Sequence, residues 1–74
     1  MNDEVIISKG RDGFITISVH PPKDVMKPRL PFLQPGNFYR DFRGARYRIT
    51  SSMMDEYGEG DGGYYVWEYE AELA

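Results

Sequence analysis

The stretch that decides the fold is YYVWEYEAEL, residues 64–73. Its residues alternate between two kinds, and such a period of two is typical of a strand with one buried face. The apolar face takes Tyr65, Trp67, Tyr69, Ala71 and Leu73, and the other face takes Val66, Glu68, Glu70 and Glu72. The pattern therefore predicts a final strand in which Trp67 is mostly buried.

A second strand is expected at residues 45–53, where Tyr47 and Ile49 alternate with arginines. Consecutive strands usually pair, so Arg46 and Arg48 would face the three glutamates of the final strand. Residues 20–49 carry seven Lys or Arg and two acids, whereas 50–74 carry seven acids and no Lys or Arg. We interpret this asymmetry as charge pairing across a sheet; two separate binding patches are the alternative.

The first part of the chain, EVIISKGRDGFITISVH at residues 4–20, has the pattern of a β-hairpin. An apolar run at 5–8 and an alternating run at 15–19 flank turn residues at 10–13. Gly13 follows an aspartate, and Asp-Gly is a turn signal because glycine accepts a positive φ at little cost. The three aliphatic residues of the second run are expected on one face: Ile15, Ile17 and Val19.

Two further segments are predicted to connect the strands. Residues 20–36, HPPKDVMKPRLPFLQPG, hold all five prolines, which disfavour a central strand or a long helix. We predict a proline-rich crossover there, with Leu30, Phe32 and Leu33 contacting the core. Residues 55–63, DEYGEGDGG, hold four glycines and four acids, and predict a mobile loop.

Length and composition limit the class of protein. A chain of 74 residues forms at most one small domain, here 1–74. It has no cysteine, which excludes disulfides and thiolate metal sites and fits a reducing compartment. No apolar run approaches the length of a membrane span, and the start is acidic rather than signal-like. The expected localisation is cytoplasmic, without a membrane partner.

The sequence offers no catalytic or cofactor site. The single histidine, His20, precedes two prolines and is interpreted as a strand boundary, and the serines lack the context of a nucleophile. The acids of the glycine-rich loop suggest calcium, but their spacing does not match an EF-hand: Asp55, Glu56, Glu59 and Asp61. We therefore predict a protein that is not an enzyme and uses no cofactor or metal.

The hypothesis that the protein binds nucleic acid rests on FYRDFRGARYR, residues 38–48, where aromatic residues are interspersed with four arginines. Phosphate contacts from arginine and base stacking on aromatics are how small β domains hold single strands. The chain has a formal net charge of −3, however, and lacks the basic surplus typical of such binding.

One resemblance bears on the fold. GNFYRDFRGARYRITSS, residues 36–52, is similar to the opening of a small bacterial SH3-like family of unknown function. The matching positions are Gly36, Tyr39, Arg40, Phe42, Arg43, Gly44 and Tyr47, with 64–73 as a later strand. The resemblance covers residues 36–73 and implies a small barrel without implying any activity.

The expected fold is mostly β: a small antiparallel sheet curled into a partly open SH3-like barrel or sandwich. The expected function is a non-enzymatic protein–protein interaction module, of which viral accessory or inhibitor-type proteins are examples. The alternative is a small β-barrel that binds single-stranded nucleic acid, and a structural or assembly subunit comes third. Assembly into a homo-oligomer is compatible with each of these functions. Exposed aromatics, arginines and methionines mark interfaces. The predicted partner-binding residues are Tyr39, Arg40, Phe42, Arg43, Met53, Met54 and Tyr57.

Overall fold

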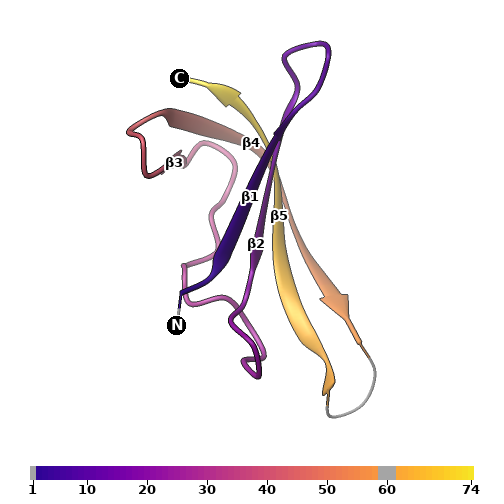
Figure 1. Cartoon of the computed structure of the whole chain (residues 1–74). Helices are drawn as coiled ribbons and strands as arrows, with labels where there is room; N and C mark the ends of the chain where they lie inside the picture. Colours follow the sequence, from indigo (N-terminus) through magenta and orange to yellow (C-terminus); the bar gives the residue numbers. More distant parts are fainter. Residues whose placement is uncertain (1, 59–61) are drawn as a thin grey trace.

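A computed structural model describes residues 2–58 and 62–74, which form one five-stranded antiparallel sheet (Figure 1). Its strands are β1 (Glu4–Lys9), β2 (Ile15–His20), β3 (Phe38–Arg40), β4 (Arg46–Tyr57) and β5 (Tyr64–Leu73). They lie in the order β1-β2-β5-β4-β3, so the last strand stands at the centre. The expectation of a mostly β protein with an antiparallel sheet is confirmed.

The N-terminal hairpin forms as expected. β1 and β2 pair antiparallel, and the amide of Gly10 donates to the carbonyl of Phe14 at 2.7 Å to close the turn. Gly13 adopts a φ of 74°, a conformation that side-chain-bearing residues rarely adopt. The three aliphatics of β2 are each at most 2 % exposed: Ile15, Ile17 and Val19.

The C-terminal hairpin also forms, with its last strand at the expected residues 64–73 and its first strand longer than expected. β4 pairs antiparallel with β5 and continues to Tyr57, which lies opposite Tyr64. Asp55 and Glu56 therefore belong to the strand, and the prediction that residues 55–63 form a loop is wrong for 55–57. Cross-strand pairing with β5 extends the ladder through this acidic segment. Residues 59–61 lie outside the described part of the chain.

A register shift in β4 divides it into two parts. Ile49 lies opposite Ala71 and Ser51 opposite Glu70, so Thr50 is an extra residue on the β4 side. Such a bulge bends a strand and reverses which alternate residues face the core. Tyr47 and Ile49 face inward before it, whereas Met53 lies opposite the glutamate at 68 after it.

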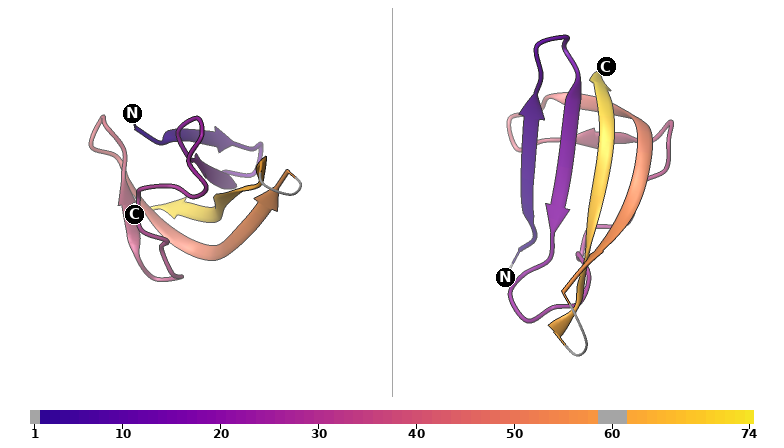
Figure 2. Two further views of the ribbon diagram at one scale, coloured as in Figure 1. Left: turned by 90° about the horizontal axis from the view of Figure 1, so that it is seen from below. Right: turned by 90° about the vertical axis from the view of Figure 1, so that its right-hand side faces the viewer.

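The sheet curls into a half-barrel (Figure 2). Its concave face holds the main core, made of Ile15, Ile17, Val19, Tyr47, Ile49, Trp67, Tyr69 and Ala71. We call the opposite, convex side the outer face. The edge strands β1 and β3 each have one strand neighbour, and they stand at the two ends of the strand order. A seam therefore separates them.

The segment between β2 and β3 packs on the concave face. Phe32 lies edge-on to Trp67, with ring centroids 5.2 Å apart, and Leu33 also packs against the core. The indole Nε1 of Trp67 donates to the carbonyl of Leu30 at 2.9 Å. The amide of Leu33 donates to the hydroxyl of Tyr69 at 2.9 Å. These bonds satisfy polar groups at the edge of the core, where leaving them unpaired is costly.

The burial of β5 differs from strict alternation at three positions. Trp67 is 7 % exposed, as predicted, but Tyr65 and Leu73 near the strand ends are exposed at 37 % and 60 %. Val66, expected on the polar face, is fully buried. Simple alternation misses this because it assumes that only one face of the strand is covered.

Candidate functional site

A groove of about 320 Å³ lies across the seam of the half-barrel. One wall is the inner side of β1, and the other is formed by β3 and the turn that follows it. We call it the seam groove; it is lined by Val5, Ile7, Lys9, Tyr39, Asp41, Phe42, Arg43 and Tyr47. Most of its lining is apolar or aromatic, and its charged groups are two cations and one carboxylate.

The most exposed aromatic on the seam groove is Phe42, at 92 %. It stands in the turn between β3 and β4, and the guanidinium carbon of Arg43 lies 5.4 Å from the centre of its ring. An arginine over an aromatic face is a weak, favourable contact that holds both groups in place. Neither side chain contributes to the core, so folding does not account for this pair.

The turn that carries Phe42 and Arg43 is rigidly built around Asp41. Its carboxylate accepts hydrogen bonds from the amides of Arg43 and Ala45, both at 2.9 Å, and from the hydroxyl of Tyr47 at 3.2 Å. Desolvation alone would raise the pKa of Asp41, but these hydrogen bonds outweigh it and hold the pKa below its ordinary value. Asp41 therefore stays ionised to hold the turn.

Tyr39 links the groove to the core. It is half-buried, and its ring stacks on that of Tyr47 with centroids 6.5 Å apart. Burial, with the charge of Asp41, raises its pKa. Tyr39 therefore supports the packing of β3 as well as lining the groove.

A second feature of this hairpin is basic. Arg40 lies opposite Arg46 across β3 and β4, and the Arg46 guanidinium carbon stands 4.7 Å from the ring centre of Phe38. Phe38 is 48 % exposed. We call Phe38, Arg40 and Arg46 the basic strip. Stacking and phosphate contacts are the chemistry that it offers.

The predicted charge pairing is confirmed for one arginine and not the other. Arg48 and Glu72 face each other across β4 and β5 and form a salt bridge at the surface. Arg46 instead extends over Phe38, because its cross-strand neighbour on β3 is another arginine. The charge asymmetry of the sequence is thus neutralised only in part within the sheet.

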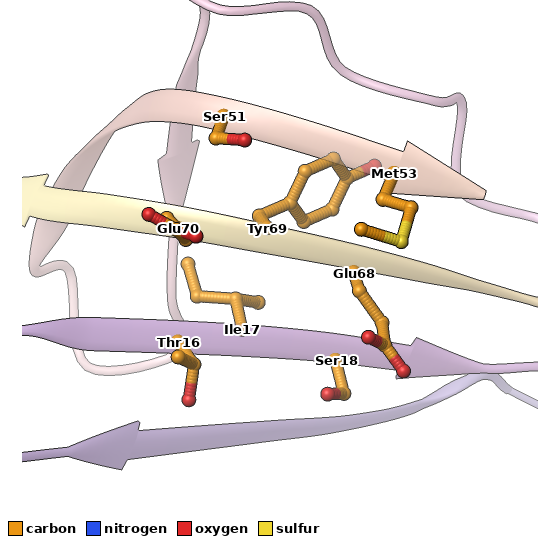
Figure 3. A pocket seen from close by; sticks show the side chains of 8 residues that line it. All are labelled: Thr16, Ile17, Ser18, Ser51, Met53, Glu68, Tyr69 and Glu70. Carbon is orange, nitrogen blue, oxygen red and sulfur yellow. The ribbon is translucent and has the colours of Figure 1, made fainter. Parts of the chain in front are cut away.

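The outer face carries a shallow pocket of about 150 Å³ over β2, β5 and β4 (Figure 3). It is lined by apolar and polar groups, among them two carboxylates: Thr16, Ile17, Ser18, Ser51, Met53, Glu68, Tyr69 and Glu70. The side chain of Glu68 extends from β5 toward Ser18 on β2 (Figure 3). This outer pocket is anionic, in contrast to the seam groove.

Tyr57 organises the far end of the outer face. Its ring stacks on Tyr64 with centroids 5.8 Å apart, and its hydroxyl donates to Glu68 Oε1 at 2.9 Å. Val66 lies between Tyr64 and Glu68 on the same face of β5 and is fully buried. A hydrogen bond with the Asp55 carboxyl, then desolvation, raises the pKa of Glu68.

The seven predicted partner-binding residues fall into two separate groups. Tyr39, Arg40, Phe42 and Arg43 gather at β3 and its turn, whereas Met53, Met54 and Tyr57 lie in the last part of β4. Met53 and Met54 are both more than half exposed. The two methionines lie on different faces of the sheet, because Met53 pairs with Glu68 and Met54 pairs with Trp67. The predicted residues therefore do not form one continuous site.

Five groove residues were not anticipated: Asp41 and Tyr47 beside the predicted residues, and Val5, Ile7 and Lys9 of β1. The three on β1 form the opposite wall. Their alternation is visible in the sequence, but it indicates only a strand face. What places them at the seam is that β5 inserts between β2 and β4 and leaves β1 at the edge. No local signal specifies that order.

Searches for other kinds of site gave negative findings. Over residues 2–58 and 62–74, no three or more His, Cys, Asp or Glu side chains stand close enough to hold a metal ion. Two of the four acids considered for calcium, Glu59 and Asp61, lie outside the described residues. Within the described chain, no helix has the length and apolar character to cross a membrane.

Comparisons of the chain with family models, with curated proteins and with solved structures found no match. The resemblance to an SH3-like family stays a prediction.

Proposed function

We propose that the chain is a non-enzymatic protein-binding module whose partner docks on the seam groove. The observation that carries the proposal is the pair Phe42 and Arg43. An aromatic ring that is 92 % exposed, held by an arginine on a turn fixed by hydrogen bonds, has no role in the core. Aromatic residues and arginine are the side chains that most often dominate the binding energy of protein interfaces.

The placement of neighbouring residues supports the same proposal. The groove wall of β1 supplies half-buried Val5 and Ile7, and Tyr39 supplies a packed aromatic floor. Apolar contacts flanked by cations at Lys9 and Arg43 give an apolar centre with a polar rim. This is the usual anatomy of a protein interface.

A second candidate function, binding of single-stranded nucleic acid, is favoured by the basic strip of Phe38, Arg40 and Arg46. The strip is short, and the chain as a whole carries a formal net charge of −3, which disfavours the approach of phosphates. We therefore rank it behind protein binding. A structural or assembly role remains third.

The finer fold assignment belongs with this proposal. We propose that the half-barrel is an SH3-like barrel left open at the seam, with residues 20–36 as the proline-rich crossover and a cytoplasmic location. In this arrangement the open seam, rather than a catalytic cleft, is the functional feature. The structural role of Asp41 in the turn leaves the groove without a free acid–base pair.

The test is affinity capture from a native cell extract on immobilised protein, with half of each sample treated with nuclease. Wild type should retain a protein that a Phe42→Ala/Arg43→Ala variant loses, with or without nuclease. Met26→Ala is the matched control, because Met26 is 66 % exposed and lies away from the groove. Capture that needs nucleic acid, or that the double variant retains, would contradict the proposal.

A further inference from the structure

We propose that the seam groove receives an extended, acidic segment of a partner, which adds to β1 as a sixth strand and closes the half-barrel. This inference rests on the proposed function and specifies the chemistry of the partner. Its three supports are the free edge of β1, the shape of the groove and the charge of the lining side chains.

The first support is the edge itself. Among the residues that the structure describes, β1 pairs only with β2, so one side of its backbone directs amide and carbonyl groups toward the seam. Proteins usually protect such edges with proline, bulges or charges in the middle of the strand. The middle of β1, Val5 to Ser8, has none of these. Strand addition at an exposed edge is a common mode of peptide recognition.

The second support is the geometry of the groove. The groove follows β1 from Val5 to Lys9, because alternate side chains of that strand line it, while β3, which forms the opposite wall with its turn, crosses the direction of β1 (Figure 2). β1 has six residues, about 20 Å of strand. A single extended segment of about that length fits along the edge. Its inward side chains would meet Val5, Ile7 and Tyr39, which favours apolar residues at alternate positions.

The third support is electrostatic. Lys9 and Arg43 both line the groove, and among the described residues neither has a carboxylate within salt-bridge distance. Asp41 also lines the groove, where its carboxylate accepts from the two amides and the hydroxyl described above, so the two cations exceed the carboxylate by one charge. The groove therefore presents net positive charge on a chain that is acidic overall. Charge complementarity selects a segment with carboxylates near one end.

The probe is a synthetic peptide, acetyl-EETVTVTG-amide, whose second glutamate would meet Lys9 when the valines face Ile7 and Val5 in an antiparallel alignment. Its control is acetyl-KKTVTVTG-amide. Affinities come from isothermal titration, and backbone pairing comes from amide hydrogen exchange measured by NMR. We expect the acidic peptide to bind at least about tenfold more tightly than the control. Alternate amides of β1 that exchange rapidly in the free protein should become protected.

Two charge-reversal variants sharpen the test. Lys9→Glu/Arg43→Glu should lose the acidic peptide and prefer the lysine peptide. Lys23→Glu/Lys27→Glu changes the net charge equally on exposed residues outside the groove, and should bind the acidic peptide like wild type. If both variants bind the acidic peptide more weakly than wild type, and to the same extent, the effect is one of general charge and the inference is overturned.

The remaining outcomes separate this inference from the proposed function. If peptide binding shifts the NMR signals of Phe42 and Arg43 but does not slow the hydrogen exchange of the β1 amides, strand addition is overturned. The groove is then still the docking site. Failure of both peptides overturns the acidic-strand inference, while the capture experiment decides the proposed function independently. Protection of β1 that grows with protein concentration, without peptide, would identify a second copy as the occupant and also overturn the inference.

Discussion

Replacing Trp67 by alanine should remove a large share of the stability of the domain. The side chain is 7 % exposed and contacts Phe32 edge-on at 5.2 Å, so truncation leaves a large cavity. Aromatic-to-alanine changes in cores cost about 3–5 kcal/mol. A domain of 74 residues has a total stability of about 4–11 kcal/mol. The variant should therefore be partly or wholly unfolded at 37 °C in the lower part of that range.

A second substitution separates packing from hydrogen bonding. Trp67→Phe keeps an aromatic ring but loses the Nε1 donor, which leaves the carbonyl of Leu30 without its partner. That loss should cost about 1–2 kcal/mol. It should also loosen the segment between β2 and β3 locally, before global unfolding.

Urea unfolding followed by far-ultraviolet circular dichroism measures both variants without relying on tryptophan emission. Trypsin cleavage after Arg29, next to the Leu30 carbonyl, reports the local loosening in Trp67→Phe. The reasoning is refuted if Trp67→Ala costs less than about 1 kcal/mol, or if the wild-type protein emits like a solvent-exposed tryptophan.

Two further predictions concern the charges of the sheet. A double-mutant cycle on Arg48 and Glu72 should give a coupling of about 0.2–1 kcal/mol, because the pair is half exposed, whereas Arg46 with Glu72 should give none; equal couplings would contradict the observed pairing. Since folding raises the pKa of Glu68, its ionised form destabilises the fold above that pKa, and this cost vanishes as the pH falls to the ordinary value of 4.5. Glu68→Gln should therefore stabilise the protein at pH 7 by a few tenths of a kcal/mol, on the order of one like-charge contact, and flatten the pH dependence of urea midpoints between pH 7 and 4; destabilisation at pH 7 would show that the carboxylate is needed there.

Much of the fold follows from local patterns. Alternation placed Ile15, Ile17 and Val19 on one face and Trp67 in the core, and the Asp-Gly pair located the first turn. These succeed because a strand with one buried face imposes a period of two on its residues.

The rest depended on interactions between distant segments. The bulge at Thr50 shifts the register of β4, so that Met53 and Tyr57 face outward. No glycine or proline in the sequence marks the position of this bulge. Val66 is buried on the outer face of β5 between Tyr64 and Glu68, both of which Tyr57 of the neighbouring strand contacts. The polar composition of residues 55–57 predicts a loop, whereas pairing with β5 makes them part of a strand.

The candidate site was predictable only in part. Phe42 and Arg43 stood out because the core did not need them. The opposing wall of β1 became visible only with the strand order, since Val5 and Ile7 look like ordinary core residues in the sequence. A binding surface that spans two distant segments is a property of topology, and local patterns do not encode topology.

The most direct test of the central claim compares binding and folding in one variant. The dissociation constant of the captured partner is measured for wild type and for Phe42→Ala/Arg43→Ala, beside the melting temperature of each. Because both side chains lie outside the core, the account predicts binding weakened by at least about tenfold, a loss of 1.4 kcal/mol or more. The melting temperature should change by less than about 4 °C, the shift expected for 1 kcal/mol in a domain of this size. Unchanged affinity, or a variant that unfolds, would contradict it.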